Sequence, residues 1–267
     1  MATSWLEKAF SLAWGEPRAR GLDLDSAEAT CAHAGILRDK PFLRQLYERY
    51  YAEFGRVDRA APPGARVELG SGAGFLDRVV PDLIRLDVRP GAAVDAVASA
   101  LAIPIAARSV GALFMLNVLH HLPDAEAFFA ELARVLVPGG RAVLVEPYVS
   151  PLSRLVYRHG HHEPFDPDRR DWRTDGAAAM TAANDALPWI VFCRDRARFE
   201  ALFPTLEIAQ VRPHTIALYA LSGGFSFRSL APGGLFPAIA AAEDLAARMP
   251  GARSLASMMT VELASRA

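Results

Sequence analysis

Three glycines, Gly70, Gly72 and Gly74, follow a short apolar run in the stretch VELGSGAGFL at residues 67–76. Glycine tolerates positive φ and lets a ligand come close to the backbone. The spacing therefore predicts either a tight turn alone or a turn that cradles a nucleotide-like ligand. A dinucleotide fingerprint, Gly-x-Gly-x-x-Gly, would place glycine at position 75, where the chain has Phe75.

Two carboxylates narrow the choice of ligand. Glu68 stands two positions before the first glycine, where it would repel a pyrophosphate but attract an ammonium group, such as the one in the amino-acid tail of S-adenosylmethionine. Asp87 ends the next predicted strand, beside the glycine turn, where a carboxylate can accept hydrogen bonds from two ribose hydroxyls. The alternative is that Asp87 only caps the turn before Pro90. Because the glycines stand beside it, the interpretation that Asp87 binds a ribose is favoured.

Polar side chains that could take part in a methyl transfer follow two later apolar runs. They are Asn117, His120, His121, Glu146 and Tyr148. A sulfonium methyl carbon is already electrophilic, so a protein must align a nucleophile, exclude water and sometimes accept a proton. His121 could accept that proton near neutral pH or could only orient its loop. Glu146 could bind substrate or cap a loop.

The elements that must position these residues alternate between strand and helix patterns. Residues 1–60 are mainly helical, because apolar residues recur at helical spacing in RDKPFLRQLYERYYAEFGR. Residues 124–140 predict a helix with Asp124 as N-cap and Pro-Gly-Gly as its stop. The predicted strands cover 65–69, 84–88, 94–99, 111–119 and 141–147. The glycines that follow the first of these strands are expected to open a helical segment. This alternation indicates an α/β fold with a doubly wound, mostly parallel sheet.

The stretches VELGSGAGFL, LDV and NVLHHLPDAEAFFAELARVLVPGGRAVLVEP resemble class I S-adenosylmethionine-dependent methyltransferases of the type-11-like group. The resemblance covers residues 65–147 and the final strand pair. It implies a Rossmann-like, seven-stranded sheet in the order 3-2-1-4-5-7-6. Strand six would be LEIAQV, and strand seven, antiparallel, would lie near residues 256–263. TIALYAL is the less favoured alternative for strand seven.

The resemblance also implies a set of residues that contact S-adenosylmethionine: Glu68, Gly70, Ser71, Gly72, Gly74, Asp87, Val88, Ser99, Ala100 and Asn117. His121 matches a histidine often found after strand four in the family, and with Glu146 it is the predicted catalytic pair. Two positions depart from the pattern. Ser99 stands where an aspartate often binds the adenine amino group, so that contact would lack a charge. Gly111 replaces an aspartate at the start of strand four, a change expected to affect packing.

These features predict a methyltransferase domain at residues 61–267 with a helical cap at 1–60. Acceptor recognition is assigned to the cap and to insertions at about 148–193 and 213–252. We expect a small-molecule or lipid-like acceptor. A non-catalytic S-adenosylmethionine-binding protein is the alternative, to which Ser99 and Gly111 lend some weight, and Phe75 argues against a nicotinamide oxidoreductase.

Composition excludes several other classes. The net charge of −1 provides no field to attract nucleic acid. No apolar run is long enough to span a membrane, and the two cysteines suit a cytoplasmic protein. The insertion at 213–252 is apolar and could contact a membrane surface, but a packed helical cap is favoured. His159, His161, His162 and Glu163 are metal-ligand types, but they share one loop with no second cluster, so no metal is expected.

Overall fold

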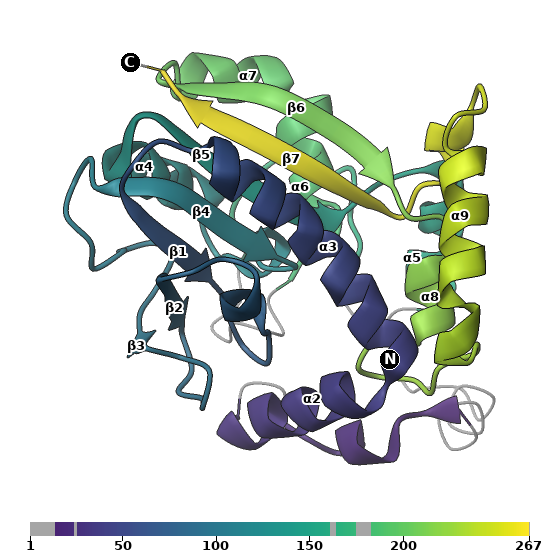
Figure 1. Ribbon diagram of the computed structural model, residues 1–267. Helices are drawn as coiled ribbons and strands as arrows, with labels where there is room; N and C mark the ends of the chain where they lie inside the picture. The colour runs from purple at the N-terminus through teal and green to yellow at the C-terminus, as the bar shows by residue number, and fades with distance from the viewer. Residues whose placement is uncertain (1–13, 24–25, 161–163, 175–182, 267) are drawn as a thin grey trace.

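The computed structural model describes residues 14–23, 26–160, 164–174 and 183–266. The strands of this part form one seven-stranded sheet in the order β3-β2-β1-β4-β5-β7-β6. Neighbours pair in parallel, except that β7 runs antiparallel to both β5 and β6. The strands, shown in Figure 1, are β1 (Ala65–Leu69), β2 (Leu83–Asp87), β3 (Ala96–Val97), β4 (Val110–Leu116), β5 (Leu136–Pro147), β6 (Leu206–His214) and β7 (Met258–Ser265). The predicted fold class and strand order are confirmed.

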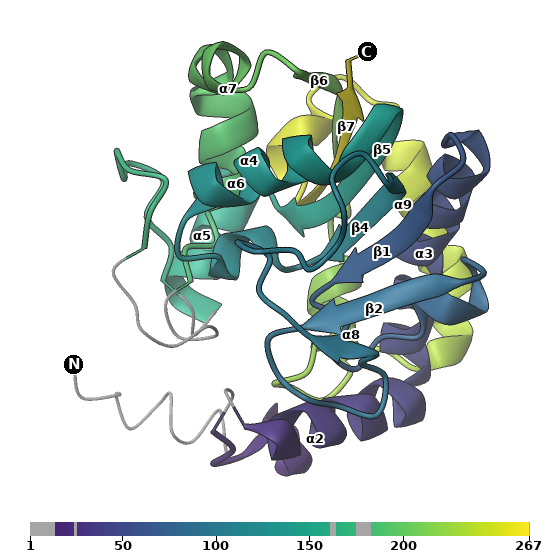
Figure 2. The ribbon, with the colours of Figure 1, turned by 90° about the vertical axis from the view of Figure 1, so that its left-hand side faces the viewer.

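Side chains of the central strands alternate between two apolar layers, one on each face of the sheet. On β4, Ala112 and Phe114 join the layer that contains α3, whereas Leu113 and Met115 join the layer that contains α4. Figure 2 shows α4, α6 and α7 gathered on one side of the sheet and α3 and α9 on the other. The helices are α2 (Ala27–Asp39), α3 (Pro41–Ala60), α4 (Ala125–Val135), α5 (Pro151–Gly160), α6 (Leu187–Trp189), α7 (Arg196–Leu202), α8 (Leu218–Ser222) and α9 (Phe236–Ala246).

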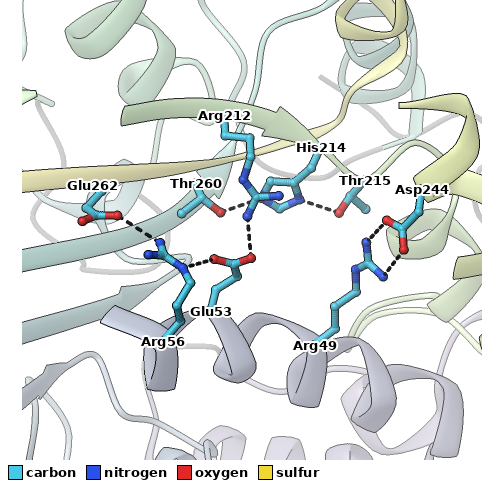
Figure 3. Close-up of polar contacts among 9 residues, drawn as sticks. All are labelled: Arg49, Glu53, Arg56, Arg212, His214, Thr215, Asp244, Thr260 and Glu262. Carbon is cyan, nitrogen blue, oxygen red and sulfur yellow. Dashed lines mark hydrogen bonds and ion pairs between the residues drawn. The ribbon is translucent and has the colours of Figure 1, made fainter. Parts of the chain in front are cut away.

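Helix α3 has one apolar and one charged side, as its sequence predicts. Its apolar side is buried from Phe42 to Phe54, and Phe54 packs against Phe114 of β4 with ring centroids 5.4 Å apart. Its charged side holds the far edge of the sheet and α9 through ion pairs (Figure 3). These join Glu53 to Arg212 of β6 (3.0 Å), Arg56 to Glu262 of β7 (3.0 Å) and Arg49 to Asp244 of α9. The N-terminal helices therefore share a core with the strands.

A half-buried histidine lies next to these ion pairs at the end of β6. The Nδ1 atom of His214 lies 2.8 Å from the Thr215 hydroxyl, and its Nε2 atom lies 2.9 Å from the Thr260 hydroxyl (Figure 3). Burial lowers the pKa of His214 to about 3, and the positive charges of Arg212 and Arg49 add to the effect. His214 is therefore neutral in the folded protein at neutral pH.

Two local expectations were wrong. The glycine turn does not open an α-helix: only the 3-10 turn Leu76–Arg78 follows, because Pro81 and the left-handed Asp82 (φ 53°) lead directly into β2. Helix α4 begins at the expected N-cap, Asp124, whose carboxylate accepts a hydrogen bond from Ala127 N, but it ends at Val135. The Pro-Gly-Gly segment lies inside β5 instead of ending the helix. TIALYAL, the less favoured alternative for strand seven, contains the helix α8, and the favoured assignment near residues 256–263 is confirmed as β7.

Gly111, the second departure from the family pattern, has a packing role. A Cβ atom at this position would collide with the Pro62 carbonyl and the Arg66 guanidinium. The chain therefore needs glycine where β4 passes beneath the segment that leads into β1. This observation removes Gly111 as an argument for a non-catalytic protein. The domain division at residue 60 stays a prediction, and the two proposed insertions contain α5 and α6, and α8 and α9, respectively.

Candidate active site

A cavity of about 350 Å³ opens at the carboxyl ends of β1, β2 and β4. This is where ligands bind in open α/β sheets. His121 lines the cavity. All the predicted cofactor residues line it as well, namely Glu68, Gly70, Ser71, Gly72, Gly74, Asp87, Val88, Ser99, Ala100 and Asn117. Their role in binding stays a prediction, but the fold brings them to one place. Glu146 and Tyr148 do not line the cavity.

The glycine turn and Asp87 are tied together. Gly70 and Gly72 have positive φ values of 68° and 45°, and a Cβ atom at Gly70 would collide with the Val118 side chain. Asp87 accepts a hydrogen bond from Gly72 N through Oδ2 and one from Arg89 N through Oδ1, both 2.9 Å long. Each carboxylate oxygen can accept a second bond. Asp87 therefore holds the two loops together and keeps further acceptor capacity at the cavity.

Glu68 lies beneath the same turn with only 3% of its surface exposed. Its Oε2 atom is buried and has no hydrogen-bond partner among the described residues. Burial raises the pKa of Glu68 to about 8, and the carboxylates of Asp77 and Asp87 add to the rise while Arg85 opposes it. A buried carboxyl group without a partner is the feature expected where the site awaits a positively charged ligand group.

The predicted adenine end of the cavity is more open. Val88 and Ser99 are exposed, and Ala100 is buried behind them. The Ser99 hydroxyl accepts a hydrogen bond from Leu101 N at 3.1 Å, so it caps the turn after β3. The backbone carbonyl of Asp87 accepts a hydrogen bond from Ala98 N and so connects this end of the cavity to β2. A ligand here would meet a serine that is already engaged locally.

Glu146 faces the loop after β4, away from the cavity. It is fully buried, and its Oε1 atom accepts hydrogen bonds from Val118 N (2.9 Å) and Leu119 N (2.7 Å). Its Oε2 atom lies 2.7 Å from Nδ1 of His120. These contacts fix the turn that carries His120 and His121. The geometry therefore favours the loop-capping alternative for Glu146.

His120 and Asp185 form part of the cavity wall next to His121. Nε2 of His120 lies 3.7 Å from Oδ1 of Asp185, and the rings of His120 and His121 lie 4.1 Å apart. Both His120 and Asp185 are almost fully buried. Sequence reasoning missed Asp185, because the irregular segment around it carries no motif. Its position depends on Asn184, whose backbone N–H donates to the His120 carbonyl.

The remaining wall is aromatic. His33 of α2, Tyr47 and Tyr51 of α3, and Tyr219 and Phe225 from α8 and the loop after it line the cavity. His33 stacks on Phe225 with ring centroids 4.5 Å apart, and Tyr47 lies 6.0 Å from Phe225 and 5.9 Å from Tyr51. Sequence reasoning placed the two tyrosines on the core side of a helix, which is correct, but no local signal revealed that this side also meets a cavity.

Residues 67–144 match the family model of a methyltransferase domain. Residues 67–144 thus form a methyltransferase domain. No curated protein matches the sequence. Among solved structures, the fold is similar to a chain from the complex of the Haloferax volcanii Trm112 methyltransferase activator with a candidate methyltransferase, at 12% identity and a TM-score of 0.51 over 92% of this chain and 98% of that chain. A geranyl diphosphate C-methyltransferase from Streptomyces coelicolor A3(2) has 16% identity and a TM-score of 0.49 over 95% of this chain and 89% of that chain.

Class I methyltransferase domains use S-adenosylmethionine, and the residues at the glycine turn fit this cofactor. Glu68 offers a buried carboxylate to its ammonium group, and Asp87 has acceptor capacity for its ribose. Among the described residues, no group of three or more His, Cys, Asp or Glu could hold a metal ion. His161, His162 and Glu163 of the RHGHHEPFD segment lie outside the described residues. No described helix is long and apolar enough to cross a membrane.

Proposed function

We propose that the protein transfers the methyl group of S-adenosylmethionine to a small-molecule or lipid-like acceptor. The observation that carries the proposal is the partnerless Oε2 atom of Glu68, buried beneath a glycine turn whose neighbouring strand ends in Asp87. Nothing in the described protein explains a buried carboxyl group there, whereas an ammonium group in the cavity would give it a partner. The family match of residues 67–144 supports the same conclusion.

When bound, the cofactor supplies a methyl group on a positively charged sulfur. Glu68 would hold its amino group, Asp87 its ribose hydroxyls, and the glycine turn would let the ligand lie against the backbone. Asn117, which adopts φ 56° at the end of β4, would bound the methionine end. Because these contacts fix the methyl carbon, the remaining tasks are to align the acceptor and to exclude water.

His121 is the proposed proton acceptor when the acceptor loses a proton. It lines the cavity, and its loop is fixed by Glu146 through the two backbone N–H groups that precede His120. Glu146 would thus act as a positioning residue, since it touches the loop and lies outside the cavity wall. The predicted catalytic pair is thus revised: His121 would face the acceptor, and Glu146 would hold the loop that carries His121.

Two measurements test the proposed function. Thermal unfolding with S-adenosylhomocysteine, and separately with NAD, should show stabilisation by the first only, because only a ligand that binds the native state raises its stability. Transfer of labelled methyl groups from S-adenosylmethionine into a metabolite extract should then yield a labelled product. Stabilisation without any transfer would favour the non-catalytic alternative, and stabilisation by NAD alone would contradict the proposal.

A further inference from the structure

The aromatic wall of the cavity, which comprises His33, Tyr47, Tyr51, Tyr219 and Phe225, comes from segments that are far apart in the chain. Lys40, at the junction of α2 and α3, donates hydrogen bonds to the carbonyls of Gly224 and Phe227, both 2.6 Å long. Lys40 is itself buried, so these bonds hold the Phe225 loop against the N-terminal helices. The wall is therefore a built surface, fixed by a buried cation that does not line the cavity.

Tyr47 and Tyr51, the part of this wall that α3 supplies, lie near Glu68, at the methionine end of the proposed cofactor site. A Cβ atom at Gly74 would collide with the Tyr51 hydroxyl and would lie 3.5 Å from Oε1 of Glu68. The Glu68 carboxyl group and the phenols of Tyr47 and Tyr51 are close enough to influence one another electrostatically. A molecule against the aromatic wall would thus lie next to the sulfur of a cofactor whose amino group is held by Glu68.

The charges around the cavity restrict what can bind there. Arg89 is the one lysine or arginine among the described residues that line it, and its Nε atom lies 3.7 Å from Asp87. Glu68, Asp87 and Asp185 are acidic. An anionic acceptor would be repelled by the carboxylates of Asp87 and Asp185, and burying it against aromatic rings would be costly. A cationic acceptor would be repelled by the positive sulfur of the cofactor, which lies in the same cavity.

Resting on the proposed function, we propose that the aromatic wall is the acceptor subsite and that the acceptor is an uncharged, ring-bearing molecule with a hydroxyl group. The ring would pack against Phe225 and Tyr47, whose faces suit aromatic stacking. The hydroxyl would face His121, which lines the same cavity. Its oxygen forms the new bond to the methyl carbon, the carbon–sulfur bond breaks with its electron pair going to sulfur, and the hydroxyl proton passes to the His121 imidazole.

The test uses the full-length protein saturated with sinefungin, an analogue that keeps a positive charge near the position of the sulfonium. Three probes share one ring system: 2-naphthol is neutral at pH 7, 2-naphthoate is an anion and 2-naphthylmethylammonium is a cation. Titration calorimetry should show 2-naphthol binding at least tenfold more tightly than either charged probe. A charged probe that binds as tightly as 2-naphthol, or no binding of 2-naphthol, would overturn the proposal.

Variants of the wall make the test specific. Phe225→Ala should weaken 2-naphthol binding at least tenfold while the Kd for sinefungin changes less than threefold. Tyr47→Phe is the matched control, because it keeps the ring and should leave 2-naphthol binding within threefold of the parent. If Phe225→Ala binds 2-naphthol like the parent, the subsite is wrong. If sinefungin itself does not bind the parent protein, the proposed function fails, whereas loss of naphthol binding alone refutes only the acceptor class.

Discussion

Glu68 links the cofactor site to a measurable proton. With a pKa of about 8, its carboxyl group is about nine-tenths protonated in the free protein at pH 7. Binding of an ammonium group beside it favours the charged form, so the proton must leave. We expect S-adenosylhomocysteine binding at pH 7 to release about 0.9 proton per protein molecule. Titration calorimetry in phosphate and in Tris, which differ in ionisation enthalpy, measures this number.

The variant Glu68→Gln separates charge from shape. It should release no proton and should bind S-adenosylhomocysteine about 10- to 150-fold more weakly, the equivalent of about 1.5 to 3 kcal/mol for a hydrogen bond to a charged group. If the parent releases no proton at pH 7, or if the variant releases as many protons as the parent, Glu68 does not meet the ammonium group. The raised pKa would then have no connection with the ligand.

The same group makes the free protein less stable in alkali. Its folded pKa of about 8 lies above its ordinary value of 4.5, so the folded state binds more protons than the unfolded state between these two pH values. The contribution of Glu68 to the free energy of unfolding is therefore greatest below pH 4.5 and falls by about 5 kcal/mol, to order of magnitude, as the pH rises through 8. Urea unfolding of the ligand-free parent and of Glu68→Gln across this range should show the fall in the parent only.

Four further changes test other parts of the structure. Asp87→Ala should weaken S-adenosylhomocysteine binding about 10- to 150-fold by calorimetry, and Asp87→Asn should lose less because its amide oxygen still accepts a bond; equal affinity in Asp87→Ala would place the ribose elsewhere. His121→Ala should lower turnover about 10²- to 10⁴-fold with little change in cofactor affinity, and unchanged turnover would leave only the loop-orienting role. Gly111→Ala should destabilise the fold by about 1 to 3 kcal/mol in urea unfolding, because the new methyl group meets the Pro62 carbonyl, and parental stability would show that this segment can move. The folded pKa of His214, about 3, lies below its ordinary value of 6.5, so its contribution to stability is present above pH 6.5 and is lost, by up to about 5 kcal/mol, as the pH falls towards 3. His214→Gln should therefore reduce the loss of unfolding free energy between pH 6.5 and pH 3 in urea unfolding. An unaltered loss in the variant would assign it to other groups.

Much of the fold follows from local patterns in the sequence. The central strands β4 and β5 contain long apolar runs, and a mostly parallel arrangement explains why they lack polar alternation. The helix predicted after the glycine turn failed for a local reason as well: Val79, Val80 and Pro81 leave no room for an amphipathic helix before β2.

The residues of the candidate site also fall into those that the sequence could predict and those that it could not. Glu68, the glycines and Asp87 could be predicted because they sit at strand ends, which a parallel sheet brings to one edge. Asp185 and the aromatic wall could not, because their positions depend on contacts between segments distant in the chain, such as the bonds from Lys40 to Gly224 and Phe227. Glu146 was found from its strand-end position, but only the geometry shows that it faces the loop and not the cavity.

The position of β7 has a consequence for the order in which the protein can fold during synthesis. β7 is made last among the strands, yet it lies between β5 and β6 and is the only neighbour of β6 in the described sheet. β6 and the Glu262 partner of Arg56 therefore cannot be fixed until residue 265 has left the ribosome. Until then the edge of β5 and the whole of β6 lack their antiparallel partner. A nascent chain stalled before β7 should expose these unpaired strand edges to chaperones, although every residue of the glycine turn has already been made.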